Sequence, residues 1–265
     1  MNREDRKQLD HSVFEAVEKF ALKVTVPIFS ATNDIVDLVG TGTFFKAKNR
    51  HFLITAAHIF EDIKPADLAI PQSNTGKRPI HLIGDSSLWT PSNDYIKTVD
   101  IAIVEIQSDE TINIIESGWQ SLTLDNVASP SPHGRYLLCG FPSKKARKDG
   151  EDFVGQMVLV ISERLDKIPP NAAKPVDENI DLFFLYGNVA FNIDGEKVSI
   201  PILKGASGAS VWQIQKQEGV KFWTPENSLK VVGIQSSALH GEFFRAKDWS
   251  YVRQMLKKID VELVS

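Results

Sequence analysis

Cysteine is almost missing from this sequence, and its scarcity excludes a fold stabilised by intrachain disulfide bonds. The chain has 265 residues and a single cysteine, Cys139, so no intrachain disulfide can form. Small secreted domains usually depend on several such bridges, whereas reducing compartments disfavour them. Cys139 lies in the apolar stretch 136–141, where we expect a buried structural thiol rather than a reactive one. The cysteine count therefore favours a cytoplasmic location.

Excess positive charge and long apolar runs are missing too. Lys and Arg number 30 against 34 Asp and Glu, so the formal net charge is -4 and there is no basic surplus to attract nucleic acid. The basic cluster 144–148 is followed at once by acidic residues, and we expect it to form a solvated loop. No apolar run is long enough to cross a bilayer, and the charged residues 1–7 lead into no signal-peptide core. We expect neither a nucleic-acid partner nor a membrane partner.

The sequence does contain the ordinary composition of a globular protein, with 42% hydrophobic and 24% charged residues. Short segments rich in β-branched and aromatic residues follow one another closely, separated by clusters of Gly, Pro, Asn and Asp. This spacing favours antiparallel barrels over alternating β-α-β units, so the predicted fold class is all-β. The expected strands are 23–30, 36–46, 51–55, 68–70, 80–83, 100–106, 135–141, 153–162, 182–188, 198–201, 211–215, 229–236 and 242–244.

A proline-rich crossover at 116–131 divides these strands into two groups. We predict a first β-barrel at 24–118 and a second at 119–246. We also expect a long surface loop at 166–177, which contains three prolines.

Helices are predicted at both ends of the chain. Residues 1–23 predict an amphipathic helix with an apolar stripe of Leu9, Val13, Val17 and Phe20. We expect this helix to pack on the body of the protein, and a partner-binding or propeptide-like helix is the alternative. Residues 247–265 predict a C-terminal helix with a stripe of Trp249, Val252, Met255 and Leu256.

A turn of small residues between two apolar strands is the candidate for a nucleophile. Ser207 lies there between Gly205 and Gly208, in the sequence LKGASGASVW. A serine hydroxyl needs a nearby base, and it needs preorganised donors for the oxyanion that its attack creates. Gly205 can adopt backbone angles that aim its own N–H and that of Ser207 at one point. A plain Gly/Ser turn in a hairpin is the alternative for this motif taken alone.

Two upstream residues could serve such a nucleophile. His58 follows the apolar segment 52–57, which places an imidazole just past a buried strand end. Asp100 stands at the mouth of the near-continuous apolar run 101–106. A carboxylate entering such a strand must find a hydrogen-bond donor, and an imidazole N–H would be one.

The order His58, Asp100, Ser207, each in its own motif, resembles the chymotrypsin/trypsin-like serine peptidase family. The motifs are T-A-A-H at 55–58, D-I-A-I-V at 100–104, G-A-S-G at 205–208, and two segments similar to strands of the family, 40–45 (as in the bacterial HtrA group) and 231–236. The resemblance covers roughly residues 24 to 260.

The resemblance implies two facing barrels with the active site in the cleft between them. Ser207 would be the nucleophile and His58 the general base, while Asp100 would orient the imidazole and stabilise its charged form. The N–H groups of Gly205 and Ser207 would form the oxyanion hole. No metal and no organic cofactor are implied.

Two departures from the family pattern concern the oxyanion loop. Ala206 stands where zymogen-activated members carry an aspartate that pairs with a newly cut N-terminus, and no matching cleavage sequence is visible near 23–30. The loop must then be held, or switched, by something else. Ala209 and Ser210 also replace the usual Gly-Pro.

The resemblance also implies a pocket for one substrate side chain. Pro201 and Ile202 stand at its base and offer no carboxylate for Arg or Lys. The expected wall consists of Gln235, Ser236, Ser237 and Ala238, with His240 within reach. We expect an apolar or small substrate side chain. An acidic or amide side chain recognised through His240 is the second choice, and an exposed His240 without a role is the plain alternative.

The predicted function is a serine endopeptidase that acts on a protein or peptide substrate. An uncontrolled peptidase would harm its own cell, so we expect either narrow specificity or control by a regulatory protein partner. The alternative is a catalytically silent trypsin-fold protein that binds peptides or proteins, because a fold alone does not fix an activity. The presence of His58, Asp100 and Ser207 together favours the enzyme.

Overall fold

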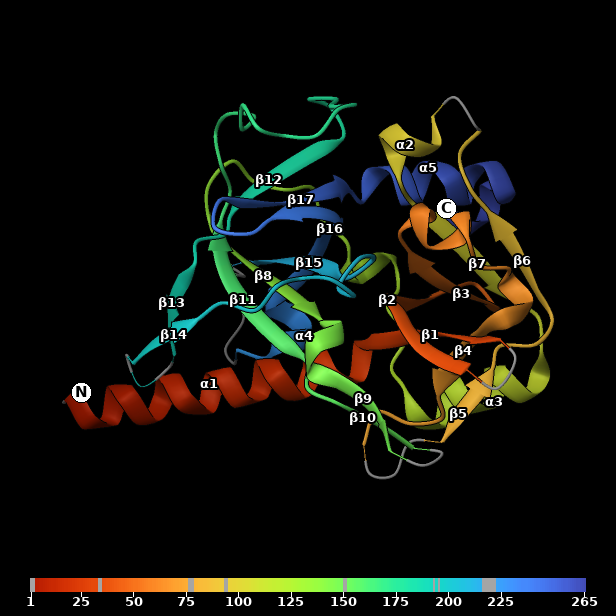
Figure 1. Ribbon diagram of the computed structural model, residues 1–265, viewed down its shortest axis with the longest axis horizontal. Helices are drawn as coiled ribbons and strands as arrows, with labels where there is room; N and C mark the ends of the chain where they lie inside the picture. The colour runs from red at the N-terminus through yellow and green to blue at the C-terminus, as the bar shows by residue number, and fades with distance from the viewer. Residues whose placement is uncertain are drawn as a thin grey trace.

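The structure of the chain is a computed structural model that describes residues 3–32, 35–75, 79–92, 95–149, 152–192, 194, 196–215 and 223–265. Two curled antiparallel sheets lie side by side, the first at the right and the second at the left of the view in Figure 1. Helices α1 and α5 lie at the two ends of the chain. The predicted all-β fold with two barrels and terminal helices is confirmed.

The first sheet has the strand order β5-β4-β1-β2-β3-β7-β6. A register shift between Ile28 and Phe29 in its pairing with β2 bends β1. The central strands β3 and β7 are buried almost throughout, because both of their faces are covered. The strands are β1 (Thr25–Thr32), β2 (Ile35–Ala47), β3 (Arg50–Thr55), β4 (Leu68–Pro71), β5 (Ile80–Leu82), β6 (Ser86–Trp89) and β7 (Ala102–Ile106).

The second sheet has the order β11-β8-β15-β16-β17-β12, and an isolated bridge between Arg164 and Phe184 connects its two edges. Its strands are β8 (Arg135–Gly140), β11 (Val158–Glu163), β12 (Asp181–Leu185), β15 (Ser210–Ile214), β16 (Leu229–Leu239) and β17 (Phe243–Asp248). Two small ribbons accompany it, β9 (Ala146–Asp149) with β10 (Asp152–Gly155) and β13 (Val189–Phe191) with β14 (Lys197–Ser199).

The helices are α1 (Arg3–Val24), α2 (Ile96–Val99), α3 (Asp109–Gly118), α4 (Pro225–Ser228) and α5 (Ser250–Ile259). In Figure 1, α1 runs along the bottom of the view beneath the second sheet. Val17 and Phe20 are buried there, as the apolar stripe predicts, whereas the side chain of Leu9 lies outside the described residues.

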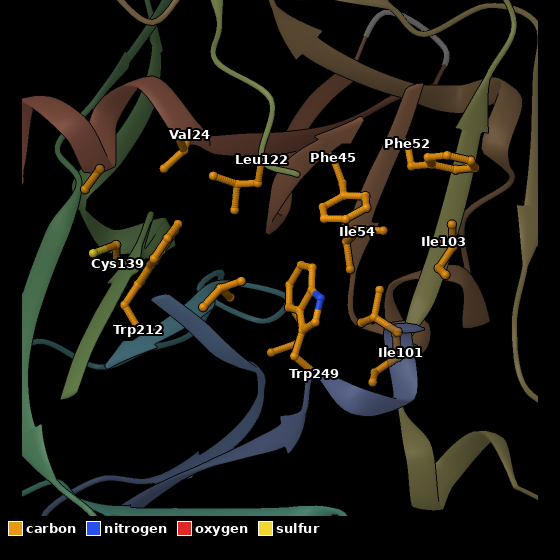
Figure 2. Close-up of a cluster of buried hydrophobic side chains, with 14 of the residues drawn as sticks. Val24, Phe45, Phe52, Ile54, Ile101, Ile103, Leu122, Cys139, Trp212 and Trp249 are labelled. Carbon is orange, nitrogen blue, oxygen red and sulfur yellow. The ribbon is translucent and has the colours of Figure 1, made fainter. Parts of the chain in front are cut away.

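The main core lies between the two sheets and is built around two tryptophans. Trp249, at the start of α5, lies 5.9 Å from Phe45 of the first sheet between ring centroids. Trp212 of β15 makes an edge contact with Phe20 of α1 at 5.6 Å. Figure 2 shows Trp249 pointing toward Ile54 and Phe45, so residues from both sheets share one apolar interior.

Several element boundaries differ from the expectations. β7 begins at Ala102, so Asp100 precedes the strand instead of belonging to it. The expected strand 153–162 is two strands, β10 and β11. β17 continues to Asp248, which delays the C-terminal helix to Ser250.

Helix α3 was not predicted. The side chain of Ser108 caps it by accepting a hydrogen bond from the Thr111 N–H, and Asp109 and Glu110 lie in its first turn, where carboxylates favour a helix.

Candidate active site

The pairing of β3 with β7 brings His58 and Asp100 together, just beyond the end of β3 and just before the start of β7. Thr55, the last residue of β3, lies opposite Ala102, the first residue of β7. Antiparallel neighbours place the end of one strand beside the start of the next. A 3₁₀ turn at Ala57–Glu61 then carries His58, and Asp100 directly follows α2. The two side chains therefore meet although 42 positions separate them in the sequence.

His58 and Asp100 are joined by three hydrogen bonds. The imidazole Nδ1–H donates to the carboxylate at 3.1 Å from Oδ1 and 3.0 Å from Oδ2. The backbone N–H of His58 also donates to Oδ1, at 3.0 Å. This carboxylate raises the pKa of His58 above its ordinary value of 6.5, against the opposing effect of burial. Asp100 is thus placed to fix both the position and the tautomer of the imidazole.

The side chain of His58 is more exposed than that of Asp100, so the imidazole can be reached from outside while the carboxylate is largely covered. The side chain of Asp100 is 13% exposed, whereas that of His58 is 39% exposed. Asp100 also has a left-handed backbone, with φ 44° and ψ 44°. Aspartate tolerates this conformation better than most residues. It turns the chain sharply between α2 and β7 and directs the carboxylate back toward His58.

The Ser207 loop packs directly against the His58 side of the first sheet. A Cβ placed on Gly208 would lie 2.1 Å from Thr55 Oγ1 and 2.9 Å from the backbone nitrogen of Ala56. A Cβ on Gly40 would lie 3.1 Å from the Ser207 carbonyl oxygen and 2.3 Å from Ile59 Cδ1. Glycine at both positions lets the backbones approach closely. The loop that carries Ser207 therefore packs directly against the segment that leads into the His58 turn, at the junction between the two sheets.

The structure does not join all three side chains. His58 and Asp100 are hydrogen-bonded, but no hydrogen bond connects Ser207 Oγ with His58, both of which are described. Catalytic hydrogen bonds are often long before substrate binds, so this geometry is compatible with a resting nucleophile. The arrangement offers an imidazole held by a carboxylate and, packed against the same part of the first sheet, the loop that carries the Ser207 hydroxyl.

The backbone N–H groups of Gly205 and Ser207 have no hydrogen-bond acceptor among the described residues. Gly205 has a φ of +91°, which favours glycine, and the turn is closed by the Ala206 N–H donating to the Leu203 carbonyl at 2.8 Å. Two unpaired N–H groups on one small loop are the donors that an oxyanion requires.

A pocket of about 230 Å³ opens beside Ser207. Its lining is Tyr186, Ile202, Leu203, Lys204, Ser207, Gln235, Ser237, Ala238 and His240. The rings of Tyr186 and His240 meet edge to face, with centroids 6.0 Å apart. The lining includes the aliphatic side chains of Ile202, Leu203 and Ala238, and Lys204 and His240 are its residues that can carry positive charge.

Five of the seven pocket residues expected from the sequence lie in this lining: Ile202, Gln235, Ser237, Ala238 and His240. Pro201 and Ser236 do not. The Pro201 carbonyl accepts a hydrogen bond from the Tyr186 hydroxyl. Ser236 is buried and turns toward β17, where its hydroxyl lies 3.5 Å from the Arg245 carbonyl. Side chains alternate along a strand, and this accounts for the absence of Ser236.

Sequence reasoning missed Tyr186, Leu203 and Lys204 in this pocket. Leu203 and Lys204 immediately precede Gly205, so their closeness to Ser207 in the sequence could have suggested them. Tyr186 gave no such signal, because its position depends on how the segment after β12 folds back.

The described residues contain no group of three or more His, Cys, Asp or Glu side chains placed to hold a metal ion. Within the same part of the chain, no helix has the length and apolar character needed to span a membrane.

No family model matches the sequence, and no curated protein matches it either. Solved structures do match. One, from Yersinia pestis, is a serine endoprotease with 13% identity and a TM-score of 0.51, covering 95% of this chain and 66% of that chain. Another is an inactivated protease paralogue from the scabies mite, with 16% identity and a TM-score of 0.53, covering 90% of this chain and 96% of that chain. The chain has a trypsin-like fold.

A third match comes from work on the coupled folding and binding of the disordered VPg protein of Sesbania mosaic virus. Its identity is 17% and its TM-score 0.51, covering 88% of this chain and 90% of that chain. At these identities the likeness extends to the fold only. Any trypsin-like activity has to be argued from the residues themselves.

Proposed function

We propose that the chain is a serine endopeptidase that hydrolyses peptide bonds with Ser207, His58 and Asp100. The observation that carries the proposal is the pairing of His58 Nδ1 with both Asp100 oxygens, at 3.0 and 3.1 Å. This pair lies beside a serine loop with two unpaired backbone N–H groups. A protein without catalytic function has no need of this combination at one junction.

The proposed reaction follows from these positions. Ser207 Oγ attacks the scissile carbonyl while His58 Nε2 takes its proton. Asp100 accepts from Nδ1–H, which leaves Nε2 free as the base and stabilises the imidazolium that forms. The carbonyl oxygen becomes negative and receives the N–H groups of Gly205 and Ser207. His58 then protonates the leaving amine, and water hydrolyses the acyl-enzyme by the same steps.

The pocket supports an apolar or small substrate side chain beside the scissile bond. Ile202, Leu203 and Ala238 provide apolar walls, and none of the described lining residues has a carboxylate to bind Arg or Lys. An acidic side chain is the second choice, because Lys204 and His240 lie in the same lining. Both side chains belong to exposed residues, which weakens their hold on a charged group.

The proposed substrate is a protein or peptide, in a reducing compartment such as the cytoplasm, where a single cysteine is unremarkable. Control by a protein partner is also part of this proposal. Such a partner could act on access to the pocket, whose rim includes the exposed residues Lys204 and His240.

A catalytically silent binding protein is the second candidate. The missing hydrogen bond between Ser207 Oγ and His58 favours it, and one of the structures similar to this chain is an inactivated protease paralogue. In this case the pocket beside Ser207 would bind a peptide without cutting it.

Labelling with a fluorophosphonate probe separates the two candidates, because the probe modifies only an activated serine. The wild type would be compared with Ser207→Ala, His58→Ala and, as a control at the first residue of β15, Ser210→Ala. We expect labelling of the wild type and of Ser210→Ala and none of the other two. A folded wild type that stays unlabelled would support the binding protein. Peptide libraries would then identify the preferred side chain.

A further inference from the structure

The oxyanion loop lacks the carboxylate that could anchor it. Its central residue is Ala206, which is completely buried and has no charge to pair. We propose that Thr41 of β2 is the positioning residue that holds this loop in its working shape in the resting chain. The inference rests on the proposed function, and it means that no activator is needed to form the oxyanion hole.

Thr41 is completely buried and uses all of its polar groups at the junction between the sheets. Its backbone N–H donates to the Ser207 carbonyl at 2.8 Å. Its hydroxyl donates to the Gly205 carbonyl at 3.0 Å and accepts from the Phe141 N–H, also at 3.0 Å. Its own carbonyl accepts from the Thr55 hydroxyl at 2.8 Å. Thr41 therefore binds the loop at two residues, Gly205 and Ser207, and at the same time contacts the second sheet through Phe141.

The carbonyl groups of the loop show why these bonds fix its shape. Every carbonyl from Leu203 to Ser207 has a donor. Two donors lie within the loop: the Ala206 N–H for Leu203 at 2.8 Å and the Ala209 N–H for Ala206 at 2.9 Å. A third is the Ser143 N–H, which holds the Lys204 carbonyl at 2.7 Å. Thr41 supplies the remaining two, for Gly205 and Ser207.

The orientation of the N–H groups follows from these carbonyls. In a trans peptide the C=O and the following N–H point in opposite directions. With the Lys204 carbonyl held by Ser143, the Gly205 N–H points away from Ser143. With the Ala206 carbonyl turned to Ala209, the Ser207 N–H points away from that turn. Reversing the peptide before Gly205 would break the bond to Ser143, and Thr41 holds the peptide after it. The loop is fixed on both sides of Gly205.

The test compares Thr41→Val, which keeps the backbone N–H and the branched shape but loses the hydroxyl, with Thr41→Ser, which keeps the hydroxyl. Thr43→Val is the matched control. It removes a buried hydroxyl two residues along the same strand, which bonds to Ser210 Oγ and not to the loop. Thr41→Ala provides a second variant without the hydroxyl, should the valine prevent folding.

The first measurement is the second-order rate of fluorophosphonate labelling of the purified chain, beside its thermal midpoint. We expect Thr41→Val to label at least about tenfold more slowly than the wild type, a fraction of what losing an oxyanion donor outright costs. Thr41→Ser should label within about threefold of the wild type, and so should Thr43→Val.

The second measurement is binding of a peptide aldehyde, whose adduct carries an oxyanion, beside the same peptide as an unreactive amide. A purely structural role for Thr41 would weaken both ligands or neither. We expect Thr41→Val to weaken the aldehyde by the same factor as labelling, with the amide unchanged.

The outcomes separate the two proposals. A folded wild type without labelling would overturn the peptidase proposal and, with it, this inference. A labelled wild type with equal rates for Thr41→Val or Thr41→Ala, or with an equal loss for Thr43→Val, would overturn the role of Thr41 alone.

Discussion

The Lys247 ammonium donates a hydrogen bond of 2.6 Å to the backbone carbonyl of Thr98, two residues before Asp100. Lys247 belongs to β17 of the second sheet, and its side chain is 1% exposed. Asp181 of β12 binds the same ammonium at 2.6 Å and also forms a two-point pair with Arg245. The segment that carries Asp100 is therefore anchored to the opposite sheet by a buried ion network.

Asp181→Asn should destabilise the protein strongly. The substitution leaves Lys247 and Arg245 buried beside each other without a counter-charge, and breaking a buried ion network in this way costs about 3–5 kcal/mol. Urea unfolding would measure the loss, with Asp166→Asn at an exposed aspartate as the matched control. Equal unfolding midpoints for the two variants would contradict the network's role.

The contact between His58 and Asp100 predicts the pH dependence of serine labelling. The attacking serine needs a neutral imidazole, and Asp100 raises the pKa of His58 above 6.5. The labelling rate should therefore rise with pH, with a midpoint above 6.5. Asp100→Asn should move the midpoint down and lower the plateau, because it removes the charge that stabilises the imidazolium. A rate profile over about pH 5 to 9 would test both, and an unmoved midpoint would refute the assignment.

The contact between His58 and Asp100 should make folding stability fall as pH rises, whereas the labelling rate should increase over the same range. Because the folded pKa of His58 lies above its unfolded value, the charged pair stabilises the fold fully below the unfolded pKa. This contribution is lost as pH rises through the folded pKa. The pH at which labelling is fastest is thus one at which the pair stabilises the fold less.

Gly208 predicts a sharp contrast between two glycine substitutions. An added Cβ there would lie 2.1 Å from Thr55 Oγ1 and 2.2 Å from the Thr41 carbonyl, and φ is +87°. Gly208→Ala should cost at least about 2 kcal/mol and slow labelling, because the serine loop must move away from the histidine turn. At Gly187 the nearest atom would be 3.7 Å away, so Gly187→Ala should stay within about 1 kcal/mol. Equal effects in denaturant titrations would mean that the loop relaxes freely.

The sequence predicted those features whose signals are local. An apolar strand ending in His58 and a small-residue turn at Ser207 are readable from neighbouring residues alone. The capping of α3 by Ser108 was also local, although the polar residues around it hid the helix. Thr41 was different, because its bonds to Phe141 and Gly205 span 100 and 164 positions. Contacts between residues so far apart in the sequence leave no periodic pattern in it. For the same reason the sequence did not predict Tyr186 in the pocket or Lys247 beside Thr98.

Substituting Phe20 would show whether α1 is an integral part of the core between the two sheets or a segment that can detach from it. Its ring is 2% exposed and makes an edge contact with Trp212 at 5.6 Å between centroids. Phe20→Ala should cost about 3 kcal/mol, whereas Lys19→Ala, whose exposed side chain pairs with Glu15 at 3.8 Å, should change stability by less than about 0.5 kcal/mol. Urea unfolding followed by tryptophan fluorescence would measure both variants.

Serine labelling of the same variants distinguishes the roles that α1 could have. A helix that only completes the core should leave the labelling rate of folded Phe20→Ala close to that of the wild type, because Trp212 lies in the core between the sheets and not in the pocket. A propeptide-like helix would instead restrain the site, and loosening it would speed labelling. The burial of Val17 and Phe20 favours the first result. A faster rate in Phe20→Ala would show that α1 regulates the proposed peptidase.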